Sequence, residues 1–144
     1  MDTPTMPLVK IDIIRNVRTP EEIKKLADVV QEVMLEKFNA PAKDRADNIG
    51  ADKRYQIITQ HEPYEMICED TGLGFERTEK LVFIQIFQQG RSREVKEATM
   101  AELAKRLGDE CEVPGTDLII SVAANTKEDW SFGMGRAQFI TGEL

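Results

Sequence analysis

The sequence has few of the side chains that usually bind metal ions. Only two of its 144 residues are cysteine, Cys68 and Cys111, and its one histidine is His61. The two cysteines stand far apart and form no Cys-x-x-Cys pair, so the usual ligands of a zinc site are too few. We therefore expect no bound metal and no cofactor, and we interpret both cysteines as reduced, buried residues that pack like small apolar side chains.

Long hydrophobic runs and blocks of positive charge are also absent. No apolar stretch approaches the roughly 18 residues of a membrane span, and residues 1–10 lack the basic and apolar segments of a signal peptide. Nineteen lysine and arginine residues against 26 aspartate and glutamate residues give a net charge of -7, which repels phosphate backbones. We therefore expect a cytoplasmic protein with neither a membrane nor a nucleic acid as partner.

The remaining composition is typical of a globular domain, with 41% hydrophobic and 31% charged residues, and 144 residues predict one domain with one modest core. Two halves of the chain resemble each other at an offset of 73 residues. An apolar run of strand length at residues 8–14 corresponds to a second run at residues 81–87. Each run precedes a helix start, with Thr19 and Pro20 in the first half and Ser92 at the matching position in the second.

Both helix starts lead into amphipathic segments, in which apolar residues recur every three or four positions. In the first half these residues are Ile23, Leu26, Val30, Val33 and Met34, and in the second half they are Val95, Ala98, Met100, Ala101, Leu103, Ala104 and Leu107. The second helix is expected to end near Gly108. Another apolar run closes each half, at residues 55–59 and 118–122, so the predicted order is β-α-β, twice.

This order predicts an α/β (α+β) fold. Because crossovers are right-handed, each unit is a parallel strand pair under its helix, and the two units together form a four-stranded mixed sheet with two helices on one face. The first unit spans residues 8–59, the second spans 81–122, and residues 124–144 form an aromatic tail that we expect to be a short hairpin or clamp. Since the strands are apolar on both sides, the face without helices must be covered by other copies of the chain. This predicts a ring-shaped oligomer.

Several of these features resemble the tautomerase superfamily. They are the strand that starts at Pro7 after Met6, the doubled β-α-β unit and the tail sequence WSFGMGRAQF at residues 130–139. The sequence is most similar to the malonate semialdehyde decarboxylase group, with which it shares the tail and the sequence EDTGLG at residues 69–74. The resemblance runs from Pro7 to Leu144. It implies a homotrimer that acts on small oxo acids.

The resemblance also implies catalysis by an amino-terminal proline that is exposed when the initiator methionine is removed. A terminal amine has a pKa of roughly 7.7–8, so its surroundings can make it a base or an acid. In this sequence five residues precede Met6, and a proline inside a chain is a tertiary amide without a basic lone pair. Our hypothesis is that Met6 is the working start and Pro7 the catalytic amine. The alternative is that Pro7 only begins an edge strand.

An aspartate is the expected partner of this proline, because the group has a Pro-x-x-Asp-Arg-Tyr-Gln pattern after its first helix. This chain instead has Pro41-Ala42-Lys43-Asp44-Arg45, an insertion at residues 46–54, and then Tyr55-Gln56. Asp44 keeps the spacing from Pro41, whereas Asp52 nearly keeps the approach to Tyr55. Both are therefore candidates, with Asp44 preferred, for a carboxylate that holds a water molecule or keeps the proline charged.

Two arginines flanking one residue bind the substrate in the decarboxylases of this group. Here Arg91 matches the second arginine, but Gln89 takes the place of the first and supplies no charge. Arg93 is a further candidate for substrate binding, although its place in the first helical turn predicts a solvent-facing side chain.

Trp130, Phe132 and Phe139 match aromatic residues that line the site in this family. A dry aromatic lining strengthens every charge interaction inside it. The resemblance implies decarboxylation of a 3-oxo acid such as malonate semialdehyde, in which Pro7 polarises the carbonyl group or forms a Schiff base with it. The first alternative is a keto-enol tautomerase, in which a single arginine suffices. The second alternative is a catalytically silent oligomeric scaffold or binding protein.

Overall fold

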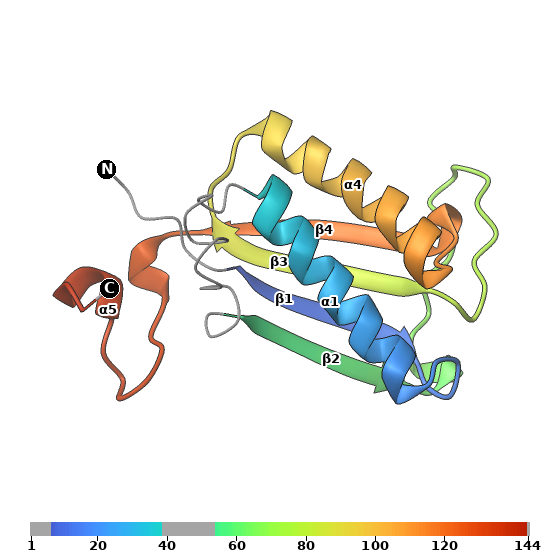
Figure 1. Cartoon of the computed structure of the whole chain (residues 1–144), viewed down its shortest axis with the longest axis horizontal. Coiled ribbons are helices and arrows are strands. Elements are labelled where there is room, and N and C mark those ends of the chain that lie inside the picture. The colour runs from blue at the N-terminus through green and yellow to red at the C-terminus, as the bar shows by residue number, and fades with distance from the viewer. Residues whose placement is uncertain (1–6, 39–53, 144) are drawn as a thin grey trace.

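The computed structural model describes residues 7–38 and 54–143, in which four strands form one mixed sheet with the order β2-β1-β3-β4. The strands are β1 (Leu8–Ile14), β2 (Tyr55–His61), β3 (Val82–Gln89) and β4 (Leu118–Asn125). β1 is parallel to β2, β3 is parallel to β4, and β1 pairs antiparallel with β3. Helices α1 (Pro20–Lys37) and α4 (Arg93–Cys111) lie side by side across one face of the sheet (Figure 1). The predicted pair of β-α-β units is confirmed.

Both long helices begin where the sequence predicts. At the start of α1 the Thr19 hydroxyl accepts a hydrogen bond from the Glu22 N–H at 3.2 Å, and the Glu22 carboxylate accepts one from the Thr19 N–H at 2.8 Å. The hydroxyl of Ser92 caps α4 in the same way. The predicted end of α4 near Gly108 is wrong, because the chain leaves the helix only at Glu112, whose φ of 55° lies in the left-handed region.

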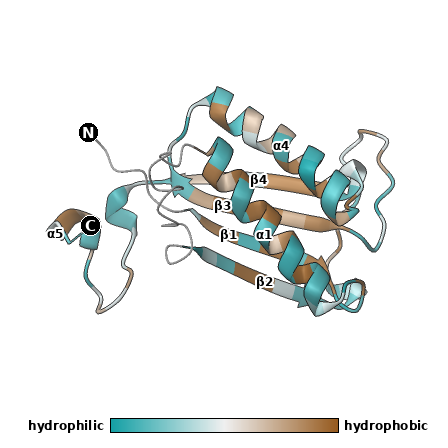
Figure 2. Cartoon of the chain, viewed as in Figure 1, coloured by the Kyte–Doolittle hydropathy of each residue, from teal (hydrophilic) through white to brown (hydrophobic). Residues whose placement is uncertain are grey.

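The hydrophobic core lies between the sheet and the two helices. One side of β1 and β3 and the inner sides of α1 and α4 supply its fully buried residues, which include Ile11, Ile13, Leu26, Val30, Val33, Ile84, Ile86, Leu103 and Leu107. Figure 2 shows hydrophobic strands beneath helices whose outer surfaces are hydrophilic. Burial of these aliphatic side chains is therefore what holds both β-α-β units together.

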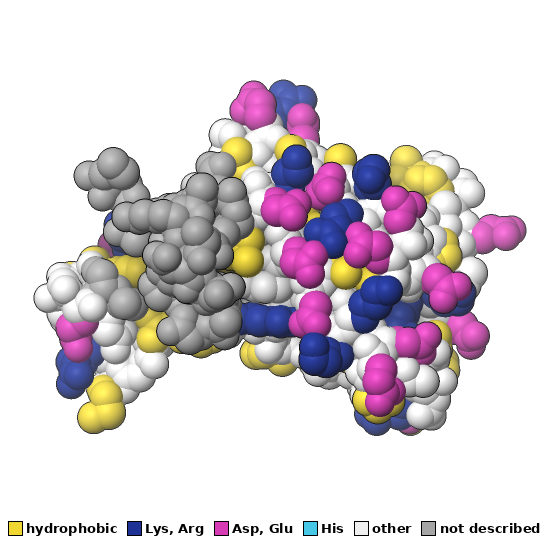
Figure 3. Space-filling view, viewed as in Figure 1, with side chains coloured by type: hydrophobic (Ala, Val, Ile, Leu, Met, Phe, Trp, Pro, Cys, Tyr) yellow, Lys and Arg dark blue, Asp and Glu magenta, His cyan; other side chains and the backbone are white. Residues whose placement is uncertain are grey.

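The outer surface of the helices carries acidic and basic side chains in alternation (Figure 3). Arg106 of α4 donates to Glu32 of α1 and to Glu110 of its own helix, both at 2.6 Å, and these hydrogen bonds raise the pKa of Arg106 above its ordinary value. Asp28 of α1 accepts from Lys24 at 2.7 Å and from Arg54 at 2.9 Å. These ion pairs join α4 to α1, and α1 to the start of β2.

The face of the sheet opposite the helices, which we call the open face, has no covering element among the described residues. Because strand side chains alternate, the residues on this face include Leu8, Lys10, Asp12, Tyr55, Ile57, Thr59, Phe83, Gln85, Phe87, Ile119, Ser121 and Ala123. Ile57 is 50% exposed and Tyr55 is 41% exposed. His61 and Asp12 form a hydrogen bond of 2.6 Å on the same face. The open face is thus more polar than predicted, although much of it is apolar.

The connection between the two halves is anchored at the sheet end where β1 and β2 finish. Asp117, which is fully buried, accepts hydrogen bonds from the Thr78 N–H at 2.7 Å and from the Thr78 hydroxyl. Arg77 donates to the carbonyl oxygen of Thr116. Residues far apart in the sequence are therefore joined directly before β3 and β4 begin.

Candidate active site

Pro7, Gln89 and Arg91 lie at the opposite end of the sheet, where β1 and β2 begin and β3 and β4 end. This end is at the left of Figure 1. Pro7 is partly buried and directly precedes β1. Its neighbour Leu8 pairs with Tyr55 of β2 and with Phe87 of β3. Pro7 therefore lies at the end of the sheet where β3 leads into the turn before α4, and the strand that it begins is a central strand and not the edge strand of the alternative prediction.

Arg91 lies in that turn and is held by backbone carbonyl groups. Its Nε atom donates to the Phe38 oxygen at 3.1 Å, and its Nη1 atom donates to the Gln89 oxygen at 3.0 Å. The guanidinium carbon is 5.1 Å from the centre of the Phe38 ring, a cation–π contact. Burial lowers the pKa of Arg91, but a guanidinium group still stays charged at neutral pH.

The positive charge of Arg91 is not neutralised within the described chain, because no described carboxylate forms an ion pair with it. Carbonyl oxygens fix its position without cancelling its charge. A half-buried cation of this kind binds a carboxylate more strongly than one in water does, because the local dielectric constant is lower.

Gln89 supplies a second, neutral donor at the same end of the sheet. It is the last residue of β3 and pairs with Asn125, the last residue of β4. Its backbone N–H donates to the side chain of Gln88 at 2.7 Å. Its side-chain Nε2 atom is buried and has no hydrogen-bond partner among residues 7–38 and 54–143. An unpartnered buried donor carries a free-energy cost that a bound acceptor atom would remove.

Four aromatic residues, which we call the aromatic cluster, lie beside this end of the sheet: Tyr55, Trp130, Phe132 and Phe139. Phe132 is at their centre, with ring centroids 5.4 Å from Trp130 in a stacked arrangement, 5.4 Å from Phe139 edge to face, and 5.5 Å from Tyr55. The three aromatic residues predicted from the tail are thus brought together. Contact with Tyr55 also fixes the tail to the start of β2.

Two residues of the site were missed by the sequence analysis. Asn125 accepts a hydrogen bond from the Trp130 indole N–H at 2.8 Å, so it orients that ring beside the end of β3. Tyr55 was assigned only as a strand residue, although it packs against Phe132. The sequence does place Asn125 at the end of a predicted strand. That Asn125 lies beside Gln89, and so at the site, follows only from the pairing of β3 with β4.

Of the hairpin or clamp predicted for the tail, the hairpin is wrong, since no strand pairing follows β4 in the described tail. After β4 the chain makes a short 3-10 turn (Lys127–Asp129), a glycine-rich loop and the four-residue helix α5 (Gln138–Thr141). Gly133, Met134 and Gly135 all have positive φ values, of 154°, 60° and 70°, and such a backbone does not continue a strand. Side chains, and not a ladder of backbone hydrogen bonds, therefore determine how the tail folds.

Not every predicted site residue lies in this group. The Arg93 side chain is 85% exposed and forms an ion pair of 3.1 Å with Glu97 on the surface of α4, in agreement with the solvent-facing orientation expected from its helix position. Asp44 and Asp52 lie outside the described residues.

The described residues contain neither a candidate metal centre nor a candidate membrane span. No group of three or more His, Cys, Asp and Glu residues in 7–38 and 54–143 is arranged to bind a metal ion. Within the same residues, no helix is long and apolar enough to cross a membrane. The groups that the described site offers are a cation, a neutral amide donor and aromatic rings, which together suit a small organic anion that carries a carboxylate and a second oxygen acceptor.

Comparison with known proteins identifies close relatives of the chain. A family profile described as "Tautomerase enzyme" matches residues 53–133, more than half of the chain. A curated protein of Bacillus subtilis (strain 168), "Probable tautomerase YrdN", is 44% identical over 96% of this chain and 100% of its own. Crystal structures of malonate semialdehyde decarboxylase are 38% identical, cover 95% of this chain and 98% of theirs, and give a TM-score of 0.81. A fused 4-OT solved as a symmetric trimer gives a TM-score of 0.69, covering 94% of this chain and 98% of its own, and at 17% identity it shows the fold alone.

Proposed function

Because the chain belongs to the tautomerase superfamily, in the group similar to malonate semialdehyde decarboxylase, we propose that it is an enzyme in which Pro7 acts as acid or base on a small oxo acid. The observation that supports this most directly is the placement of Arg91. Its half-buried guanidinium group is fixed by carbonyl oxygens in the turn after β3, the strand that pairs with the start of β1 beside Pro7. The substrate carboxylate binds Arg91, and the substrate oxygen to be polarised accepts from Gln89.

The proposal requires Met6 to be the start of the mature chain and to be removed, so that Pro7 carries a free secondary amine. Such an amine ionises near pH 8 and can take or give a proton at neutral pH, whereas the amide of an internal proline can do neither. The aromatic cluster supports this chemistry, because apolar rings exclude water and strengthen the interactions of the amine with a bound anion.

Asp44, and not Asp52, is our proposed partner for Pro7, because it keeps the spacing from Pro41 in the Pro-x-x-Asp-Arg pattern of the group. The insertion at residues 46–54 separates Asp44 from Tyr55 in the sequence, and Asp52 is the alternative. A carboxylate in this role holds a water molecule or keeps the proline amine charged.

Of the two reactions that the sequence predicts, the neutral side chain of Gln89 favours keto-enol tautomerisation. A tautomerase moves one proton between carbon and oxygen, so one arginine for the carboxylate and one amide donor for the carbonyl oxygen suffice. Decarboxylation of a 3-oxo acid is the second candidate, supported by the 38% identity to malonate semialdehyde decarboxylase. In that reaction a protonated Pro7 donates a hydrogen bond to the 3-oxo group, whose carbonyl takes up the electron pair released as carbon dioxide leaves, and the enolate so formed is then protonated at carbon.

We also propose that three copies assemble through their open faces. The exposed Ile57 and Tyr55 and the other apolar residues of that face support this, because apolar surface of this extent is usually covered in a folded protein. The trimer itself is implied by the family resemblance. Size-exclusion chromatography with light scattering tests it, and a stable monomer contradicts it.

The first experiment is intact-mass analysis of the protein made from its own transcript, followed by two assays. One assay follows conversion of an enol to its 2-oxo acid, and the other follows carbon dioxide release from a 3-oxo acid, each between pH 5 and 9. Tautomerase activity should rise as Pro7 deprotonates, and decarboxylase activity should fall. Pro7→Ala and Arg91→Gln should each reduce the observed activity by about a hundredfold or more, whereas Arg15→Gln, on the exposed far end, should not.

A mature chain that keeps Met1 overturns the proline mechanism. Full activity of Pro7→Ala overturns it as well. A chain that begins at Pro7 and catalyses neither reaction would instead favour the catalytically silent scaffold or binding protein.

A further inference from the structure

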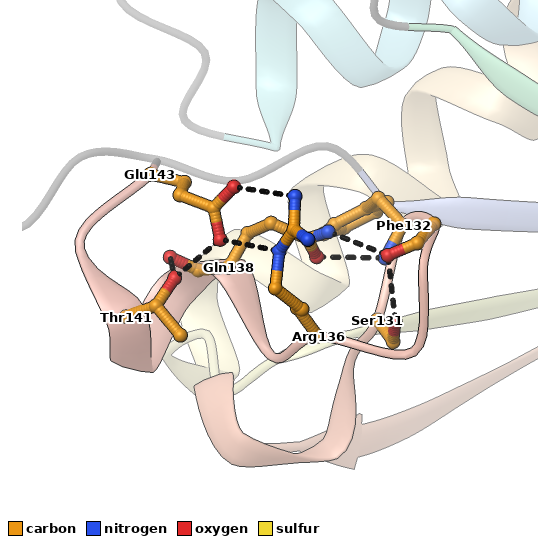
Figure 4. Close-up of polar contacts among 7 residues, drawn as sticks. Ser131, Phe132, Arg136, Gln138, Thr141 and Glu143 are labelled. Atoms are coloured by element: carbon orange, nitrogen blue, oxygen red, sulfur yellow. Dashed lines mark hydrogen bonds and ion pairs between the residues drawn. The ribbon is translucent and has the colours of Figure 1, made fainter.

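We propose that Gln138 is a positioning residue, which holds Phe132 at the centre of the aromatic cluster. Figure 4 shows its side chain reaching from the start of α5 back to the glycine-rich loop. Its Oε1 atom accepts a hydrogen bond from the Phe132 N–H at 2.9 Å, and its Nε2 atom donates to the Gly133 oxygen at 2.8 Å. The inference rests on the proposed function in so far as it concerns the substrate site.

The loop that carries Phe132 has little else to fix its backbone. The one backbone–backbone hydrogen bond described within it runs from the Arg136 N–H to the Gly133 oxygen and is long, at 3.3 Å. Three consecutive residues with positive φ lie directly after Phe132. A segment of this kind has many accessible conformations, so fixing one of them requires specific contacts.

The Gln138 amide supplies these contacts in the way a neighbouring strand would. It offers one acceptor and one donor, and it uses them on the N–H of one residue and the carbonyl group of the next. Only one orientation of the amide satisfies both partners, because an N–H must meet an oxygen and a carbonyl group must meet an N–H. The same residue begins α5, and its backbone oxygen accepts from the N–H groups of Gly142 and Glu143. Gln138 therefore ties the end of the tail to the loop.

The position of Phe132 determines the cluster as a whole, because its ring contacts the three other aromatic rings. Gln138 itself is followed directly by Phe139, so one residue orients two members of the cluster. A shift of the loop would separate the Phe132 ring from Tyr55 and thereby detach the tail from the start of β2. Gln138 thus acts on the substrate site through Phe132, without contacting the substrate.

The tail contains a second set of polar contacts that serves as a matched control. Arg136 forms an ion pair of 3.3 Å with Glu143, and Thr141 donates to Glu143 at 2.7 Å (Figure 4). Both charged side chains are largely exposed, at 54% and 42%. Exposed ion pairs contribute little, so Glu143→Gln should leave the loop and the activity as they are.

The test compares Gln138→Glu and Gln138→Met with Glu143→Gln. The glutamate variant keeps the acceptor for Phe132 but places an oxygen against the Gly133 oxygen, and the methionine variant loses both hydrogen bonds. Trp130 is the only tryptophan of the chain and stacks on Phe132, so its emission reports the order of the cluster. In both Gln138 variants we expect the Trp130 emission to shift to the red and to be quenched more strongly by acrylamide. We also expect a roughly tenfold loss of kcat/KM, mainly through a higher KM, and an unchanged urea midpoint.

The two readouts separate this inference from the proposed function. If the wild-type protein catalyses neither assay reaction, the proposed function fails, and the Trp130 emission alone decides whether Gln138 positions Phe132. If both Gln138 variants have the same Trp130 emission and the same KM as the wild type, the inference is overturned. A red shift with an unchanged KM in an active enzyme also overturns it, because the loop would then move without consequence for the substrate.

Discussion

Replacement of Asp117 should destabilise the protein strongly while leaving the chemistry of the active site unchanged. Asp117 is fully buried and lies at the end of the sheet opposite Pro7 and Arg91. Its two carboxylate oxygens accept from the N–H and the hydroxyl group of Thr78, and the Arg18 guanidinium lies within electrostatic reach. The perturbations to compare are Asp117→Ala, Asp117→Asn and Thr78→Val.

The expected magnitudes follow from the hydrogen bonds that each variant loses. Asp117→Ala removes the acceptor of both Thr78 donors and leaves a cavity at a fully buried position, so it should lower the free energy of unfolding by about 2–3 kcal/mol. Asp117→Asn still accepts from the Thr78 N–H and loses mainly the charge, so we expect about 1–2 kcal/mol. Thr78→Val removes the hydroxyl group, which also accepts from the Lys80 N–H at 3.1 Å, and should cost about 1–2 kcal/mol.

Urea unfolding followed by far-ultraviolet circular dichroism measures these values, with all variants at one protomer concentration because association shifts apparent stability. Asp109→Asn is the control, since Asp109 is 69% exposed and its ion pair with Lys105 is 3.8 Å long. Because Asp117 and Thr78 contact each other, the double variant should cost less than the sum of the single ones. Losses below about 0.5 kcal/mol for both Asp117→Asn and Thr78→Val would refute the structural role assigned to this pair.

Three further predictions concern charge and burial. Arg106→Gln should lower the free energy of unfolding by about 1 kcal/mol, and 1 M NaCl should reduce the difference, because Arg106 bridges carboxylates of α1 and α4. Burial raises the pKa of the Cys111 thiol, so with the other cysteine replaced by serine it should react with a thiol reagent at pH 8 several-fold more slowly than a model thiol. Hydrogen bonds from Lys24 and Arg54 lower the pKa of Asp28 in the folded protein. The carboxylate therefore contributes fully to the free energy of unfolding above pH 3.8, its pKa in the unfolded chain, and this contribution is lost as the pH falls through its lower folded pKa. Asp28→Asn should therefore flatten the decline of the urea midpoint below roughly pH 4.

The order of the elements and the division into two β-α-β units could be predicted from the amino-acid sequence alone. The capping residues Thr19 and Ser92 and the apolar periodicity of the helices are local signals, and the structure confirms the helices that they predict. The end of α4 was predicted too early, because a glycine within a helix does not end it unless the chain adopts a left-handed conformation there. At Cys111 the chain still follows the helix, and only Glu112 adopts that conformation.

The side chains that meet at the site are brought together only by the packing of the folded chain. The sequence indicated Arg91, Trp130 and Phe132, because the family resemblance is carried by their motifs. It could not indicate that Asn125 orients Trp130 or that Tyr55 packs on Phe132, since both contacts depend on strand register and on a tail without backbone pairing. Local propensity and periodicity act over a few residues of chain, whereas these contacts join segments distant in sequence, which only the packed sheet brings together.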